Sequence, residues 1–338
     1  MRTSTIQKTL VLAGFVALAL APLVLDIYRT RLLLTFLGYG VALLGFNLIF
    51  AYAGLLSFGH ALFVALGSYT VAFMTTQFEI YSMELTLLMA ILVGAGVATV
   101  VGALCVRYVE VYFAMLTFAF GMLFYTAILK SYDLTGGDEG MPVDRPNVLG
   151  LDLGDLGHLD FLRGPYYYYA LGVFILATLI MWRIVQSPFG LALKTIRDNP
   201  EKAQYLGIPI RMYRWYAFVI SGIFGAVGGA LMAPVDGHVD AGLAYWTESG
   251  TVVFMVLLGG FANFIGPLVG GLVYINLLDV VQSLTEYWRI AFGGILAVIV
   301  IVAPGGLMGL FGTVARRALP GLAGGETAIE VEKPRGAA

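Results

Sequence analysis

The side chains that could do chemistry gather in one polar segment, residues 187–208, of an otherwise apolar chain. Lys194, Arg197 and Asp198 place both signs of charge there. The nearest approach to a phosphate-binding loop, residues 190–195, lacks the spacing of a Walker A motif and the glycine before its lysine. The segment therefore predicts a surface that binds another protein, and ATP binding by this chain is not expected.

The same segment has the sequence signals of two short helices. Ser187 can cap the first helix, and Pro188 suits its first position, where a missing N–H costs nothing. Asn199 and Pro200 repeat this signal for a second helix. Gly207 can end that helix in a left-handed conformation.

Other reactive residues are too scattered to form a site. His60, His158 and His238 lie far apart in sequence, and no carboxylate cluster accompanies them. The single Cys105 excludes an internal disulfide. The chain also lacks HExxH and GxSxG motifs. We therefore expect no catalytic residue, no metal site and no enzymatic activity.

Composition indicates an integral membrane protein. Hydrophobic residues make up 59% of the 338 and charged residues 12%, against about 25% charged in soluble domains. A net charge of −2 gives nucleic acid binding no electrostatic support. Each span needs roughly 20 apolar residues. The ten predicted spans are residues 9–25, 33–53, 60–78, 85–106, 110–129, 166–186, 215–234, 248–262, 267–285 and 290–312.

The first span has an alternative interpretation, because Arg2 and Lys8 precede a short apolar core and residues 19–21 resemble a signal-peptide cleavage site. The chain stays apolar through Leu25, which favours a retained span.

Lysine and arginine set the expected orientation. With the N-terminus inside, 13 of the 19 basic residues fall on the cytoplasmic side, and both termini are cytoplasmic. We therefore expect a transmembrane domain over residues 1–315 with a cytoplasmic segment at 187–210. The loop at 130–164 is extracytoplasmic, either a solvated connection or a docking surface. A disordered cytoplasmic tail is expected at 316–338.

Residues 32–78 carry no formal charge and would form a helix about 70 Å long, two membrane thicknesses. Their midpoint, residues 54–60, is either a cytoplasmic turn or a break inside the membrane that lines a cavity. A second interruption at residues 258–267 suggests inverted repeats, with substrate passing near both. The predicted pathway residues are Asn47, Ser57, Phe58, Gly59, His60 and Phe63.

These motifs resemble a known family. Residues 54–69 (GLLSFGHALFVALGSY) resemble the early signature of LivM-type permeases, the membrane subunits of branched-chain amino acid (HAAT) ABC importers. Residues 187–199 resemble the coupling loop of those permeases, and Glu201, Ala203 and Gly207 match the E-x-A-x-x-x-G pattern that meets the ATPases. Further matches lie at residues 258–260, 266–267 and 303–307, so the resemblance covers about 33–312.

The resemblance implies an all-α ABC importer permease of about ten transmembrane helices with an inverted repeat, in a bacterial inner membrane. It implies a second, LivH-like permease, two cytoplasmic ATPases that bind ATP and Mg, and a periplasmic solute-binding protein. This chain itself would bind no cofactor. Phe189 is expected to be an apolar knob at the tip of the coupling segment. The residues expected to couple to the ATPases are Ser187, Pro188, Phe189, Gly190, Lys194, Arg197, Asp198, Asn199, Glu201 and Gly207.

Two departures weaken details of the match: Leu191 stands where the family often has arginine, and Pro200 where an acidic residue is commoner. The cargo also stays open among branched-chain amino acids, urea, short amides and aromatic acids. An ion-coupled secondary transporter or channel, or a purely structural subunit, are the other classes. Asp279 and Glu286 are expected near the outer ends of their spans, and the lack of a deeper carboxylate disfavours ion coupling.

Overall fold

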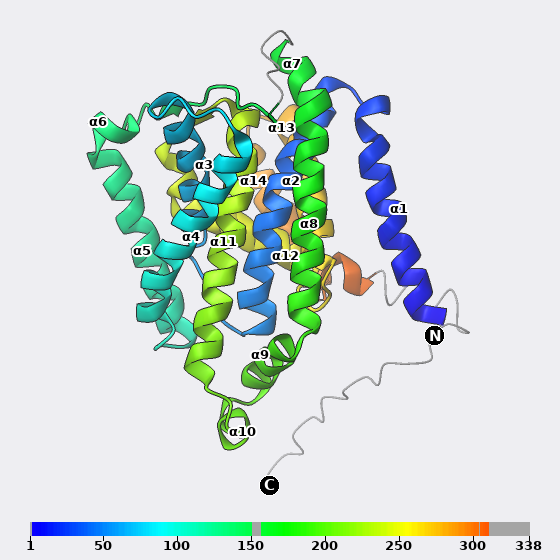
Figure 1. The fold of residues 1–338 in the computed structure, drawn as a ribbon. Helices are drawn as coiled ribbons and strands as arrows, with labels where there is room; N and C mark the ends of the chain where they lie inside the picture. The colour runs from blue at the N-terminus through cyan, green and yellow to red at the C-terminus, as the bar shows by residue number, and fades with distance from the viewer. Residues whose placement is uncertain (1, 151–156, 304, 311–338) are drawn as a thin grey trace.

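The chain is described by a computed structural model that covers residues 2–150, 157–303 and 305–310. The predicted tail and the last two residues of the tenth predicted span lie outside the described residues. The described chain is almost entirely helical (Figure 1). In chain order the helices and strands are α1 (Arg2–Val24), α2 (Ile27–Asn47), η1 (Leu48–Tyr52), α3 (Ala61–Thr76), α4 (Met83–Cys105), α5 (Glu110–Lys130), α6 (Tyr132–Thr135), β1 (Met141–Pro142), α7 (His158–Phe161), η2 (Leu162–Tyr166), α8 (Tyr167–Gln186), α9 (Pro188–Asp198), α10 (Pro200–Tyr205), α11 (Ile210–Asp236), β2 (His238–Val239), η3 (Ala241–Ala244), α12 (Trp246–Gly259), α13 (Gly266–Leu284) and α14 (Trp288–Val302).

The helices confirm the predicted all-α membrane fold. Within the described residues, seven helices are long and apolar enough to cross a membrane, and three shorter apolar helices lie in α1, α3 and α12. Together they correspond one to one with the ten predicted ranges. We call the two ends of the bundle the α10 end and the α7 end (Figure 1). The N-terminus lies toward the α10 end.

The first helix packs against α8. The Phe15 and Phe174 rings meet edge to face with centroids 6.3 Å apart. The Tyr167 hydroxyl donates to the Leu18 carbonyl at 2.7 Å. These contacts give α1 a packing role in the bundle.

The centre of the bundle is α11, which packs against α2, α3 and α4. Small residues allow backbones to approach closely in a membrane, where burial of apolar surface gives little drive. A Cβ on Gly67 would lie 1.8 Å from the Ala226 carbonyl oxygen, and a Cβ on Gly229 would lie 1.9 Å from the Val64 oxygen. Glycine is therefore required on both sides of the α3–α11 contact.

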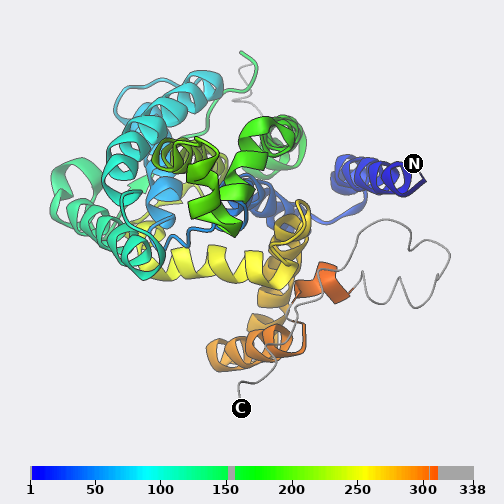
Figure 2. The same cartoon turned by 90° about the horizontal axis from the view of Figure 1, so that it is seen from below.

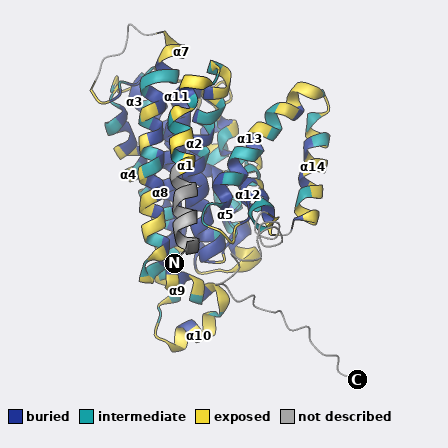
Figure 3. Cartoon of the chain, turned by 90° about the vertical axis from the view of Figure 1, so that its right-hand side faces the viewer, coloured by how far each residue is buried: buried dark blue, intermediate teal, exposed yellow. Residues whose placement is uncertain are grey.

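The periphery is more open. Figure 3 shows the buried residues concentrated in the central helices, whereas α14 stands apart and α10 is largely exposed. From below, α12 runs across the bundle and is steeply inclined to the long helices (Figure 2). At the α7 end, β1 pairs antiparallel with β2, which joins the long loop after α5 to the end of α11.

Candidate functional sites

The polar segment folds as the two predicted helices, α9 and α10, which project beyond the bundle (Figure 1). Asn199 caps α10, because its Oδ1 accepts the Lys202 N–H at 2.9 Å. Gly207 is left-handed, with φ +77°. Both agree with the sequence. The prediction that the Ser187 side chain caps α9 was wrong, because its hydroxyl donates to the preceding Ile184 carbonyl at 2.7 Å. The Ser187 backbone is nevertheless extended, as a capping residue requires.

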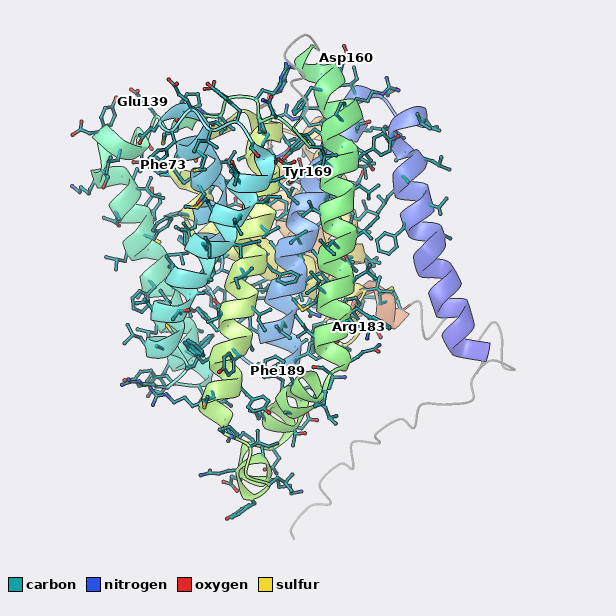
Figure 4. The ribbon with its side chains drawn as sticks, viewed as in Figure 1. Phe73, Glu139, Asp160, Tyr169, Arg183 and Phe189 are labelled. Carbon is teal, nitrogen blue, oxygen red and sulfur yellow. The ribbon has the colours of Figure 1, made fainter. Side chains whose placement is uncertain are left out.

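Phe189 fixes α9 to the bundle. Its ring stacks on Tyr213 of α11, with centroids 5.5 Å apart and planes 17° apart, and the side chain is half-buried. Figure 4 shows Phe189 at the same end of the molecule as Arg183, opposite Glu139 and Asp160. In this conformation Phe189 packs inward, so its expected role as a protruding knob stays a prediction.

Gly190 is needed at the corner between α8 and α9. A Cβ at this position would lie 2.2 Å from the Val185 carbonyl oxygen in the last turn of α8. The sharp α8–α9 corner therefore admits no larger residue without moving α9.

The exposed apolar side chains of this element lie elsewhere. Tyr205 is 90% exposed, Leu206 73% and Leu191 67%. Tyr205 and Leu206 lie at the end of α10, inside the E-x-A-x-x-x-G pattern, and sequence reasoning missed them. Their signal was an aromatic and an aliphatic residue in a helix otherwise rich in charge.

Arg197 connects α9 to the end of α2. Its Nη1 donates to the Ala51 carbonyl in η1, and its Nη2 lies 2.7 Å from an Asp198 carboxylate oxygen. A Cβ on Gly54 would lie 2.7 Å from the Arg197 Cγ. The Lys194 ammonium lies 5.1 Å from the centroid of the Tyr52 ring. The charged face of α9 therefore holds the point where the first break begins.

That break lies inside the membrane-spanning bundle. It starts at Gly54, with φ +72°, and α3 begins only at residue 61. The His60 ring contacts Phe46 of α2, with centroids 5.3 Å apart. A Cβ on Gly59 would lie 2.0 Å from the carbonyl oxygen of Thr117, near the middle of α5. Residues 54–60 are therefore packed within the bundle, and their position inside the membrane stays a prediction.

The break leaves polar groups without partners at this depth. Among the described residues, nothing accepts a hydrogen bond from the backbone N–H groups of residues 56–60. The side-chain atoms Asn47 Oδ1, Ser57 Oγ, His60 Nε2 and Ser221 Oγ are buried and likewise lack a described partner. Irregular backbone is tolerated at membrane depth where it is buried in protein or lines a water-filled cavity. These unpaired N–H groups and side-chain atoms can therefore form hydrogen bonds with water or with a small polar solute.

The sequence-predicted pathway residues do gather here. Asn47, Ser57, His60 and Phe63 are all at most 2% exposed, and the His60 and Phe63 rings lie 5.7 Å apart. Phe58 is half-buried. Gly59 has a packing role as well, because Thr117 leaves no room for a side chain.

The helix is interrupted at the second predicted position, between α12 and α13. Residues 260–265 form a tight turn between α12 and α13, in which a Cβ on Gly259 would lie 1.8 Å from the Gly266 oxygen. The Phe261 ring contacts Phe50 near the end of the α2–η1 helix, toward the α10 end. The counterpart of residues 54–60 is instead residues 237–245, which follow α11 and lead into the half-length helix α12.

The two half-length helices meet at their N-termini. The Ser249 hydroxyl, in the first turn of α12, accepts the Ala61 N–H at the start of α3 at 2.9 Å. One helix is entered from the α10 end and the other from the α7 end. This inverted relation is typical of transporters, in which broken helices present their positive N-terminal ends to a site near the midplane.

A carboxylate lies beside this junction. Glu248, also in the first turn of α12, is half-buried and accepts a hydrogen bond from the Tyr39 hydroxyl of α2 at 3.0 Å. The expectation that no carboxylate lies deep in a span was wrong. In the sequence, Glu248 is separated from the apolar run 252–258 by Ser249, Gly250 and Thr251. Among the described residues, no group of three or more His, Cys, Asp or Glu is arranged to hold a metal ion.

Comparison with known proteins identifies the family. Residues 28–304 match the family model described as branched-chain amino acid transport system / permease component. The chain belongs to this family. Its match begins at α2 and extends through α14, so it includes both half-length helices and the α9–α10 element.

Several known permease proteins are similar to the chain over half of its length or more. The high-affinity branched-chain amino acid transport system permease protein LivM of Escherichia coli (strain K12) is 25% identical over 323 residues, covering 90% of this chain and 76% of that protein. A probable branched-chain amino acid transport permease protein LivM of Methanocaldococcus jannaschii is 25% identical, covering 82% of this chain and 92% of that protein. An autoinducer 2 import system permease protein LsrC of Yersinia pestis (strain Pestoides F) is 25% identical over 183 residues, covering 52% of this chain and 49% of that protein. No solved structure significantly matches the chain.

The family and the fold together establish a multi-pass membrane permease component of an ABC transporter. The names of its relatives include permeases for different solutes, so family membership alone does not assign the cargo.

Proposed function

We propose that this chain is the permease subunit of an ABC importer that carries branched-chain amino acids or related small polar solutes by alternating access. Its partners would be a LivH-like permease, two ATPases that bind ATP and Mg outside this chain, and a periplasmic solute-binding protein. It would lie in a bacterial inner membrane with both termini in the cytoplasm. The alternative cargoes, urea, short amides and aromatic acids, have no specific support in the structure.

The observation that carries the proposal is the α9–α10 element and its link to the break. Tyr205 and Leu206 present apolar surface to the aqueous phase at the tip of α10. Clustered exposed apolar surface marks a protein interface. Arg197, at the other end of the element, holds the Ala51 carbonyl. Movement of the ATPases would therefore be transmitted through α9 to the start of the break.

The pathway would pass the break itself. Asn47, Ser57 and His60 supply polar atoms, and Phe63 an apolar wall, at the point where α3 begins. Such a lining offers a polar solute transient hydrogen bonds and little selectivity. A change of state requires that the solute or ATP bind the two states with different affinity.

Paired substitution of Tyr205 and Leu206 by serine tests the docking proposal. We expect the variant to insert normally and to lose co-purification with a chain that carries a Walker A motif, together with ATP-dependent leucine uptake in proteoliposomes. Tyr132→Ser is the matched control, because Tyr132 is 58% exposed at the α7 end. Undiminished co-purification of the paired variant would exclude this surface as the ATPase contact.

A further inference from the structure

Within the described part of the chain, the hydrogen bond from Tyr39 to Glu248 is the one side-chain hydrogen bond between α2 and the half-length helix α12. The hydroxyl and the carboxylate are 3.0 Å apart, and both side chains are half-buried. An ionisable residue within a membrane span is costly, and it marks a substrate or ion pathway by default. The pair therefore needs an explanation beyond packing.

The carboxylate of Glu248 has no cationic partner in the described part of the chain. The ion pairs found there join Arg31 to Asp236 and Arg197 to Asp198. The groups that act electrostatically on Glu248 or are acted on by it are Tyr39, Tyr274 and Asp240, which are hydroxyls and a second carboxylate. Phenol rings and carboxylates are the groups that recognise ammonium ions in proteins.

Hydrogen-bond donors lie on the other side of the junction, at the start of α3. Ser249 bonds the first N–H of α3, and the unpartnered N–H groups of residues 56–60 precede it. These groups, with the N-terminal end of α3, favour negative charge. The junction thus has a hydrogen-bond acceptor, Glu248, on one side and hydrogen-bond donors, residues 56–60, on the other. Ser249, which follows Glu248 in the chain, connects the two sides through its bond to Ala61.

We propose that Tyr39 and Glu248 form a cation-recognising station on the solute pathway, which binds the ammonium group of a zwitterionic solute whose carboxylate faces the N–H groups of residues 56–60. The inference rests on the proposed function, because it assumes that the break lines the pathway. It adds a residue that selects solutes by charge inside the permease, independently of any solute-binding protein.

A purely structural clamp between α2 and α12 is the competing explanation. Glu248→Gln separates the two, because glutamine can still accept the Tyr39 hydrogen bond but has no charge. A clamp predicts wild-type behaviour for this variant. A cation station predicts the loss of ammonium recognition without loss of folding.

The test measures modification of Glu248 by a carbodiimide, read by mass spectrometry of the peptide that contains it, on the full chain purified with its native partners and without solute-binding protein. The probes are leucine, leucinamide, which keeps the ammonium group, and N-acetylleucine, which lacks it. Exposed Glu139 at the α7 end is the internal control, and Glu248→Gln is the unlabelled reference.

We expect leucine and leucinamide to slow modification of Glu248 roughly tenfold at saturation, the effect of a hydrogen bond to a charged group, and N-acetylleucine to have no effect. In the same preparation, Glu248→Gln should keep the wild-type thermal midpoint and lose leucine uptake. Equal protection by all three probes, no protection, or an unreactive Glu248 would each overturn the proposal. ATP-dependent uptake is scored separately: its absence from wild type rejects the importer, whereas wild-type uptake by Glu248→Gln rejects the station alone.

Discussion

Replacing Arg197 by alanine should uncouple ATP hydrolysis from transport. Arg197 joins the α9 helix to η1 through its bond to the Ala51 carbonyl, and its stem packs against Gly54, where the break begins. A hydrogen bond that involves a charged group contributes about 1.5–3 kcal/mol. The Arg197 side chain is 38% exposed, so we take the lower end, about 1.5 kcal/mol. That energy corresponds to roughly a tenfold change in the equilibrium between two states.

The assay is the number of solute molecules taken up per ATP hydrolysed, measured in proteoliposomes that hold the whole complex. We expect this ratio to fall about tenfold in Arg197→Ala while ATP hydrolysis stays within about twofold of wild type. Arg197→Lys keeps the charge but lacks the forked guanidinium, so it should give an intermediate value.

Lys202→Ala provides the matched control, because it removes one basic residue from the neighbouring α10 helix, where Lys202 is exposed. Equal ratios for Arg197→Ala and wild type would show that α9 does not transmit movement through Ala51. Equal losses in both variants would indicate a general effect of charge at the ATPase surface.

Three further outcomes are expected. Gly67→Ala should lower the thermal midpoint in detergent, by a cost of about 1–3 kcal/mol from overpacking against α11, whereas Gly172→Ala, with no atom within 4 Å of the added Cβ, should not. Gly190→Ala should leave insertion intact but reduce ATPase co-purification, and normal co-purification would show that the α8–α9 corner can relax. Ser249→Ala should destabilise the protein by about 1–3 kcal/mol, because it leaves the Ala61 N–H unpaired, and Ser249→Thr should restore the thermal midpoint.

The sequence predicted the helices well because apolar runs of span length are a strong local signal. The ends of α9 and α10 also followed from local chemistry, since Pro188, Asn199 and Gly207 each have a conformational preference that no distant contact overrides. Family resemblance then supplied the class of function.

The parts that sequence reasoning missed depend on distant contacts. No residue near Phe189 in the sequence indicates a contact with Tyr213, so the inward stacking of Phe189 could not be predicted. The counterpart of residues 54–60 was assigned to residues 258–267, which hold three glycines and a proline, whereas residues 237–245 hold two glycines and no proline. Glu248 is the first residue of the predicted span 248–262, and only the meeting of α3 with α12 shows that this end of the span lies beside the junction.

The half-length helices have a consequence for how the chain enters the bilayer. At 1.5 Å per residue, the 16 residues of α3 reach about 24 Å and the 14 residues of α12 about 21 Å, short of the roughly 30 Å hydrocarbon core. Each is preceded by irregular backbone, which lipid cannot solvate. Neither can be inserted alone as an independent span, so each must be delivered together with the long helix before it, α2 or α11. Substitutions that weaken the α3–α11 contact should therefore appear first as defects of membrane insertion and turnover during biogenesis.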